Sequence, residues 1–194
     1  MGLERKQFLR SVLDSASEQP RGAVFRWVKQ GGIAVSFQAV KEYFQKAGLG
    51  QRVLLLEQSS ATVEQAAQAL GCAPKQIAKT LSFLVEEQPI LIVAAGDAKV
   101  DNHKYKEQFH QKAAMIPREA VEDLVGHPPG GVCPFCVLPG VKVYLDVSLK
   151  RFEQVYPAAG SGNSAVLLNL PELEEHSGGA GWIDVCKGWE DTAQ

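Results

Sequence analysis

Hydrophobic and polar positions along this chain recur with the periods of short helices and strands from Ser36 onward. Val40, Tyr43 and Phe44 follow that serine at helical spacing, and the pattern stops before Gly48. Since serine is a favoured helix cap and glycine a common helix terminator, this stretch predicts an amphipathic helix.

Two apolar runs in the middle of the chain predict a central hairpin. They cover Thr80–Val85 and Ile90–Ala95, with a polar turn between them. Upstream, Thr62 and Gln65 have the spacing of a capping box, which predicts a helix that ends at Gly71. The hairpin should therefore follow a short capped helix.

Helices and strands are interspersed through the rest of the chain. We expect further strands at 52–57, 141–146, 155–159 and 165–170, a helical turn at 74–77, and helices at 102–109 and 118–125. The connection 160–163 is short enough to join the last two strands tightly. This mixture predicts an α+β fold with a mixed sheet rather than a doubly wound parallel sheet.

Composition narrows the class of protein. The chain has 194 residues, 45% of them hydrophobic, which is enough for one buried core. Its net charge of −2 gives no global attraction to polyanions, so a nucleic acid would have to be bound by a local patch. The longest apolar run, Ile90–Ala95, is far below the ~20 residues that span a bilayer, and the N-terminus lacks a signal-peptide core. We therefore expect a cytoplasmic protein that contacts no membrane and whose four cysteines are reduced.

Residues 1–34 differ in charge from the rest, with six basic and three acidic side chains. Pro20 and the pair Gly31-Gly32 interrupt this segment. We predict an N-terminal extension over 1–34, partly helical or poorly ordered, followed by one domain over 35–194. The extension could be a basic arm that contacts RNA, but a poorly ordered leader or a surface helix is the simpler interpretation, and we favour it.

Lys79 is the first candidate for chemistry. It stands where the expected helical turn meets the strand, next to Thr80, so its ammonium group could reach a cavity beside the sheet. Taken alone, a lysine at such a place is more often a solvated charge at the rim. The position becomes informative only in combination with other segments.

Two glycine-containing segments could approach a ligand closely. Gly126–Phe135 is dense in glycine and proline, which fixes an irregular backbone with free amides, although a plain connector is the alternative. Ala159–Asn163 contains two glycines and offers Ser161 and Asn163 for hydrogen bonding, although a hairpin turn is the simpler explanation.

These segments, in this order, resemble the YbaK family, which is also found as the inserted editing domain of bacterial prolyl-tRNA synthetases. The resemblance runs from about Val35 to Leu173. It rests on Thr62-Val-Glu-Gln-Ala-Ala, Ile77-Ala-Lys-Thr-Leu, Val93-Ala-Ala-Gly-Asp97, Gly130-Gly-Val-Cys-Pro-Phe135, Tyr144-Leu-Asp146 and Ala159-Gly-Ser161. It implies a barrel-like mixed sheet surrounded by helices, and a hydrolase that deacylates mischarged tRNA without a metal or cofactor. The implied partner is the aminoacylated acceptor end of tRNA, with a synthetase as a second one.

Carried over position by position, the resemblance makes Lys79 the essential catalytic lysine. The substrate-binding residues that it implies are Thr80, Gly130, Gly131, Val132, Cys133, Asp146, Gly160, Ser161 and Asn163. The chain departs from the family at Cys133, where a serine is common, and at Cys136, where a small residue is common. The acyl group is therefore left open among cysteine, alanine, serine and similar small residues, on tRNA for proline or another acceptor.

Hydrolysis of an aminoacyl ester requires a polarised carbonyl, a water in line and a pocket for the side chain. Lys79 could supply positive charge to the developing oxyanion or to the terminal phosphate, and amides around Gly131 and Gly160 could donate hydrogen bonds. The aminoacyl ester is already activated, so no Ser-His-Asp or Cys-His arrangement is needed. We therefore expect an enzyme that acts by positioning.

The cysteines allow a different chemistry. Cys133 and Cys136 form a CxxC pair, and with His127 and Cys186 they could bind zinc or exchange disulfides. A structural zinc site normally has two ligand pairs at regular spacing, and this chain has one. We therefore expect reduced loop thiols and no metal.

A second functional class also fits the residues. The chain could be a module that binds aminoacyl-tRNA or a synthetase without hydrolysing anything. Such a module would tolerate Lys79→Ala, whereas an editing enzyme would lose release of the amino acid. His103 and His110 flank the expected polar helix, and we predict that both are solvated rather than acid–base groups.

Overall fold

A computed structural model describes residues 35–190, so the predicted extension over 1–34 lies outside the described residues. The helices are α2 (Val35–Lys46), α3 (Val63–Leu70), α4 (Asn102–Phe109), α5 (Val121–Val125) and α6 (Leu170–Ser177). Short 3-10 turns are η1 (Gly50–Arg52), η2 (Pro74–Gln76), η3 (Arg118–Ala120) and η4 (Val147–Arg151). The strands are β1 (Val53–Leu55), β2 (Ile77–Val85), β3 (Gln88–Ala95), β4 (Lys99–Val100), β5 (Lys142–Asp146), β6 (Gln154–Pro157), β7 (Ser164–Val166), β8 (Leu168–Asn169), β9 (Gly181–Ile183) and β10 (Cys186–Lys187).

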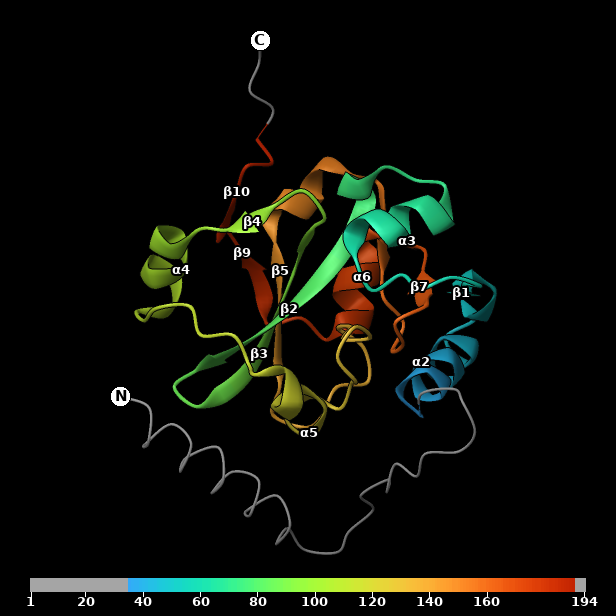
Figure 1. Cartoon of the computed structure of the whole chain (residues 1–194), viewed down its shortest axis with the longest axis horizontal. Helices are drawn as coiled ribbons and strands as arrows, with labels where there is room; N and C mark the ends of the chain where they lie inside the picture. The colour runs from blue at the N-terminus through green and yellow to red at the C-terminus, as the bar shows by residue number, and fades with distance from the viewer. Residues whose placement is uncertain (1–34, 191–194) are drawn as a thin grey trace, which may run out of the picture.

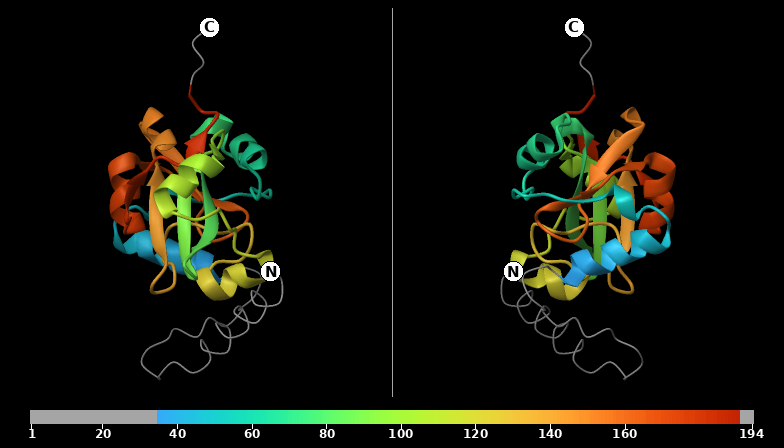
Figure 2. Two further views of the ribbon diagram at one scale, coloured as in Figure 1. Left: turned by 90° about the vertical axis from the view of Figure 1, so that its left-hand side faces the viewer. Right: turned by 90° about the vertical axis from the view of Figure 1, so that its right-hand side faces the viewer.

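Six strands form a central mixed sheet in the order β8-β6-β2-β3-β5-β9. Strands β2 and β3 are antiparallel, whereas β6 and β5 run parallel to β2 and β3 respectively. The sheet curls into a half-barrel with helices around it (Figure 1), and α3 and α6 lie on opposite sides of it (Figure 2). The predicted α+β class with a barrel-like mixed sheet is confirmed.

The predicted central hairpin is present, but its first strand begins earlier than expected. Strand β2 starts at Ile77, where it pairs with Tyr156 of β6 as well as running beside β3, so the helical turn ends one residue before. Lys79 consequently lies inside the strand, opposite Ala94, and not at its junction with the turn. Pairing with the neighbouring strands β3 and β6 sets where β2 begins, and the local sequence pattern carries no information about this pairing.

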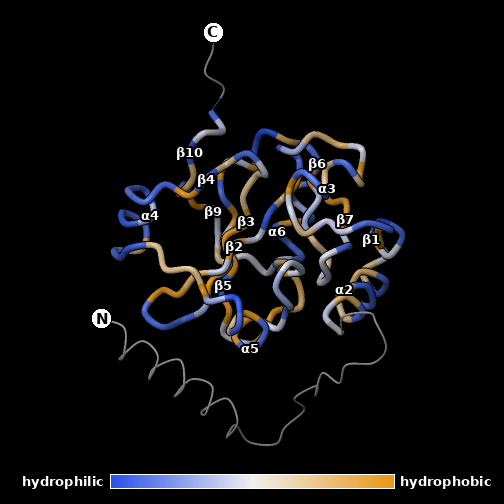
Figure 3. The backbone as a smooth tube through the Cα atoms, viewed as in Figure 1, coloured by the Kyte–Doolittle hydropathy of each residue, from blue (hydrophilic) through white to orange (hydrophobic). Residues whose placement is uncertain are grey.

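The core lies along β3. All five residues of Leu91–Ala95 are fully buried. Side chains of a strand point alternately to the two faces of a sheet, so both faces must be covered here. The hydropathy colouring of Figure 3 shows the same division, with apolar central strands and a polar helix α4 at the periphery. Among residues 35–190, no helix is long and apolar enough to cross a membrane.

The two predicted helix caps have different outcomes. Thr62 caps α3 through its hydroxyl, which accepts a hydrogen bond from a first-turn amide at 3.2 Å, and Gly71 ends that helix with a φ of 66°. Ser36 is not a cap, because α2 has already begun and the hydroxyl donates to the carbonyl of Gly160. That bond ties α2 to the second glycine-containing segment.

The predicted strand at 165–170 is divided between two partners. Strand β7 pairs with β1, whereas β8 pairs with β6, so these residues leave one sheet for another. One bridge, between Ala158 and Ala165, is all that remains of the expected hairpin among residues 35–190. The local pattern predicted extended backbone correctly but could not assign its partner.

Candidate active site

A cavity of about 230 Å³ lies between α3, strand β2 and the loop that carries Gly130. This volume is below the roughly 300–1,000 Å³ of pockets for drug-sized ligands, so the site suits a small group. Four predicted site residues line it, namely Lys79, Thr80, Gly130 and Val132. The rest of the wall includes residues that were not predicted, among them Ser60, Tyr156, Ala158, Ser164 and Ala165.

Lys79 lines the cavity, and its side chain reaches the Gly96–Ala98 turn. Its ammonium group donates to the carbonyl of Gly96 at 2.9 Å and to the carbonyl of Ala98. An ammonium group has three N–H donors, so one remains for a ligand. Burial lowers the pKa of Lys79, while nearby acidic groups, Asp97 and Glu64 among them, oppose that shift. The arrangement offers one directed positive charge to the cavity.

Thr80, the next residue of β2, has an unsatisfied polar atom. Its hydroxyl oxygen is buried and has no hydrogen-bond partner among residues 35–190. Buried hydroxyl groups in folded proteins are almost always bonded. Because Thr80 lines the cavity, a bound ligand could supply the missing partner.

The two glycine-containing segments pack against each other beside the cavity. A Cβ atom added to Gly131 would lie 2.7 Å from the Cα atom of Ser161, so only glycine allows this approach. Gly160 has a φ of 89° and is equally close to the backbone of Ser36. Gly131 and Gly160 are therefore needed for backbone packing, and neither is among the residues that line the cavity.

The amides predicted to stabilise an oxyanion are already engaged. The N–H of Gly131 donates to the carbonyl of Pro128 at 2.9 Å. The N–H of Ser161 donates to the hydroxyl of Ser164 at 3.1 Å, and the amide of Gly160 faces the sulfur of Cys133. Lys79 is consequently the better candidate for polarising a carbonyl group.

Ser161 and Asn163 hold the second turn together. The Ser161 hydroxyl donates to the side-chain oxygen of Asn163 at 3.0 Å and lies 2.8 Å from the hydroxyl of Ser164. The amide of Asn163 donates to the carbonyl of Leu56 at 3.1 Å. Neither residue is among those that line the cavity, whereas Ser164, which the sequence analysis did not select, does line it.

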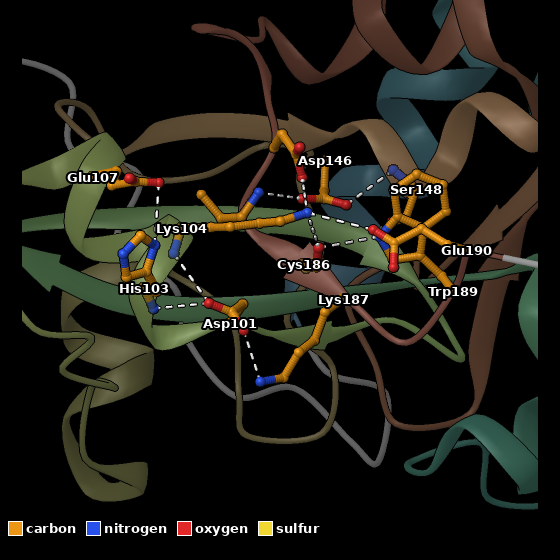
Figure 4. A network of polar contacts seen from close by, with 12 residues as sticks. Asp101, His103, Lys104, Glu107, Asp146, Ser148, Cys186, Lys187, Trp189 and Glu190 are labelled. Atoms are coloured by element: carbon orange, nitrogen blue, oxygen red, sulfur yellow. Dashed lines mark hydrogen bonds and ion pairs between the residues drawn. The ribbon is translucent and has the colours of Figure 1, made fainter. Parts of the chain in front are cut away.

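Asp146 and Cys133 lie away from the cavity wall. Asp146 is fully buried, and its carboxylate accepts a hydrogen bond from the N–H of Ser148 at 2.9 Å (Figure 4) and another from the N–H of Val185 at 3.0 Å. Cys133 is fully buried too, with its sulfur 3.6 Å from the carbonyl of Phe135, and burial raises the pKa of its thiol. Neither is among the cavity-lining residues of the described chain, so the structure does not bring these two predicted residues to the cavity, and their binding role stays a prediction.

The four residues considered for zinc do not converge. Nε2 of His127 lies 2.7 Å from the carbonyl of Phe135 and 3.6 Å from the sulfur of Cys133. Cys136 is exposed, and Cys186 lies beside Asp146 instead. Within residues 35–190, no group of three or more His, Cys, Asp or Glu side chains could hold a metal ion.

The two other histidines lie on the surface. The side chain of His103 is 82% exposed and lies 3.4 Å from Glu107. His110 ends α4 with a φ of 57°, also exposed. Both are therefore solvated, as predicted, and neither is among the residues that line the cavity.

Comparison with known proteins adds a family to this geometry. Residues 57–175 match the family described as the aminoacyl-tRNA editing domain. The uncharacterized protein YwhH of Bacillus subtilis is 51% identical over 157 residues, which are 80% of this chain and 100% of the relative. A proline–tRNA ligase of Leuconostoc mesenteroides is 24% identical over 118 residues, or 58% of this chain and 21% of the ligase. A solved structure described as a candidate trans-editing enzyme for prolyl tRNA synthetase has a TM-score of 0.72 and 27% identity, covering 81% of this chain and 100% of the other.

Proposed function

Since the chain belongs to the aminoacyl-tRNA editing domain family, we propose that it is a trans-editing hydrolase that removes a wrongly attached small amino acid from tRNA. One observation carries this proposal. Lys79, whose ammonium group keeps one N–H without a partner among residues 35–190, lines a small cavity between α3 and the Gly130 loop. A charge held in this way suits an ester carbonyl that becomes negative during hydrolysis.

The proposed reaction requires no covalent intermediate with the protein. The aminoacyl side chain enters the cavity, and Lys79 donates a hydrogen bond to the ester carbonyl oxygen or to the terminal phosphate of the tRNA. Water adds to the carbonyl carbon, and the bond from that carbon to the ribose oxygen breaks. The ribose oxygen takes the proton that the attacking water loses, and the free amino acid leaves. Lys79 remains protonated and lowers the barrier by stabilising the oxyanion.

The cavity supports a small acyl group such as cysteine, alanine or serine. Its volume is about 230 Å³, and its wall includes five alanine residues, Ala61, Ala66, Ala78, Ala158 and Ala165. The unpartnered hydroxyl of Thr80 could bond to a polar atom of the substrate. A pocket of this kind separates substrates that differ by one methylene by only about 1–3 kcal/mol, which is why a second, hydrolytic check is useful. The similarity to a proline–tRNA ligase supports tRNA for proline as the acceptor.

The proposal is tested with a panel of labelled cysteinyl-, alanyl- and seryl-tRNA for proline, with prolyl-tRNA as the correctly charged control. Release of label and retention of tRNA on a filter are measured in parallel. We expect at least one mischarged member to lose label faster than it does in buffer, while prolyl-tRNA stays charged. Retention of the tRNA without loss of label from any member would refute hydrolysis and identify a binding module.

A further inference from the structure

The two carbonyls that hold Lys79 belong to the turn Gly96–Ala98, and the residue between them has its own partner. The carboxylate of Asp97 accepts two hydrogen bonds from the guanidinium of Arg151, at 2.6 and 3.1 Å. Lys79 thus binds the turn through its carbonyls, and Arg151 binds it through its carboxylate. Planar bidentate pairs of this type fix geometry better than a single ion pair does.

Arg151 is itself immobilised. Its Nε–H donates to the carbonyl of Ser148 at 3.0 Å, and a terminal N–H donates to the carbonyl of Trp189 at 2.9 Å. The guanidinium carbon also lies 4.9 Å from the ring centre of Phe152 and 5.2 Å from that of Trp189. The side chains of Arg151 and Asp97 are 19% and 32% exposed, so solvent screens this pair less than a surface pair.

A second contact joins η4 to Ala95, the last residue of β3, directly before the turn. The hydroxyl of Ser148, which is fully buried, accepts a hydrogen bond from the N–H of Ala95 at 3.1 Å. Asp146 in turn accepts a hydrogen bond from the N–H of Ser148, as Figure 4 shows, and another from the N–H of Val185. Element η4 therefore holds the chain at Ala95, the residue before the turn, and at Asp97 within it.

The other side of the turn leaves no room for adjustment. A Cβ atom on Gly96 would lie 2.0 Å from the carbonyl oxygen of Pro74 and 2.7 Å from a methyl group of Val63. The turn is therefore packed between η2 and α3 on one side and η4 on the other. A small displacement at Asp97 would be transmitted to the carbonyls that hold Lys79, because the packed elements give little.

We propose that Asp97 and Arg151 form a positioning pair that fixes the Gly96–Ala98 turn and, through it, the direction of the Lys79 ammonium group. This inference rests on the proposed catalytic role of Lys79. The lysine side chain is a flexible four-carbon stem, and its direction depends on where the two carbonyls lie. The negative charge of Asp97 also supports the charged form of Lys79 against burial. Loss of the pair should therefore loosen the ammonium group and reduce its charge at high pH.

The test uses Asp97→Asn, Arg151→Gln and the double variant in the full chain. Asp184→Asn is the matched control, because it removes the charge from the ion pair with Lys104 at 2.9 Å, in the same C-terminal network but away from the turn. The substrate is the mischarged tRNA that the wild type deacylates fastest. Its single-turnover deacylation rate is measured as a function of pH. Nitrogen-15 NMR of the Lys79 amine, assigned from the spectrum of Lys79→Arg, reports its pKa and proton exchange without any turnover.

We expect each single variant to deacylate on the order of 10- to 100-fold more slowly, the cost of small misplacement at a reacting centre. The double variant should be no slower than the worse single one, because both changes remove one interaction. In Asp97→Asn the pKa of Lys79 should fall, and the alkaline limb of the rate profile should move to lower pH with it. Asp184→Asn should behave like the wild type.

An unchanged Lys79 pKa and unchanged proton exchange in both single variants would overturn the positioning role, even if their activity fell. Additive losses in the double variant would overturn it as well. Arg151→Lys provides a folded comparison, since it keeps the charge and loses the fork, and it should lose activity nearly as far as Arg151→Gln does. The Lys79 signal could respond as expected while the wild type releases no amino acid from any tRNA. That result would support the positioning of Lys79 by Asp97 and Arg151 and refute the proposed hydrolysis.

Discussion

Replacing Gly131 by alanine should separate the two turns beside the cavity. The added Cβ atom would lie 2.7 Å from the Cα atom of Ser161, 2.9 Å from its nitrogen and 3.0 Å from the carbonyl carbon of Gly160. All three atoms belong to the backbone, so no side-chain rotation relieves the contact. Ordinary contacts of a Cβ atom begin near 3.4 Å, so the facing turn must retreat by several tenths of an ångström.

That retreat opposes bonds that hold the facing turn in place. The N–H of Ser161 is bonded to the hydroxyl of Ser164 at 3.1 Å, and the carbonyl of Gly160 accepts a bond from Ser36. Overpacking of a tightly packed site typically costs about 1–3 kcal/mol. We expect the free energy of unfolding to fall by an amount in this range. Because Gly130, the preceding residue, lines the cavity, its displacement should also slow deacylation.

Gly162→Ala is the matched control from the same turn. A Cβ atom there would meet the carbonyl oxygen of Gly130 at 3.6 Å, which is an ordinary contact, and its φ is not in the left-handed region. This variant should stay within about 0.5 kcal/mol of the wild type or gain slightly, since alanine reduces the entropy of the unfolded chain. The two variants are compared by urea unfolding with linear extrapolation. Equal stability of Gly131→Ala and Gly162→Ala would refute the close packing of the turns.

Two further predictions concern stability. Tyr105 is fully buried with an unpartnered hydroxyl among residues 35–190, so Tyr105→Phe should leave the urea midpoint unchanged or raise it by the equivalent of up to ~1 kcal/mol, and a clear loss would show a missing partner. Burial lowers the pKa of His127 below its ordinary 6.5. The unfolded chain therefore binds the proton more readily, and stability should decline as pH falls through about 6.5. Unfolding measured between pH 8 and 5 should show a smaller decline for His127→Gln, and an equal decline in both proteins would contradict this assignment.

The sequence predicts well those elements whose signals are local. Helix α4 has the bounds expected for it because Asp101 caps its first turn, at 2.8 and 3.1 Å from two amides. Helix α6 was missed although Asn169 and Glu172 exchange a capping box, at 2.8 and 2.9 Å, which a search for caps would have found. Strands β4 and β10 are two residues long each, and their existence depends on their pairing with each other.

The residues of the site also fall into those that local motifs predict and those that only the fold brings together. Lys79, Thr80 and Gly130 follow from a resemblance that rests on short contiguous segments, and all three line the cavity. Tyr156 and Ser164 line it because of how β6 and β7 pair, which no local pattern reveals. The expectation of free amides at the glycine turns fails for a similar reason, since their hydrogen-bond partners are set by the folded turns themselves.

The catalytic role of Lys79 is tested most directly by the single-turnover deacylation rate of Lys79→Ala. The substrate is the mischarged tRNA that the wild type deacylates fastest. Lys142→Ala serves as the control, because Lys142 is exposed at the far end of β5, opposite Ile90. Removing a group that stabilises an oxyanion costs about 10²- to 10³-fold in rate. We predict a loss of this size for Lys79→Ala in a protein that still folds and unfolds cooperatively, and a wild-type rate for Lys142→Ala. A folded Lys79→Ala protein that deacylates within threefold of the wild type would contradict the central claim.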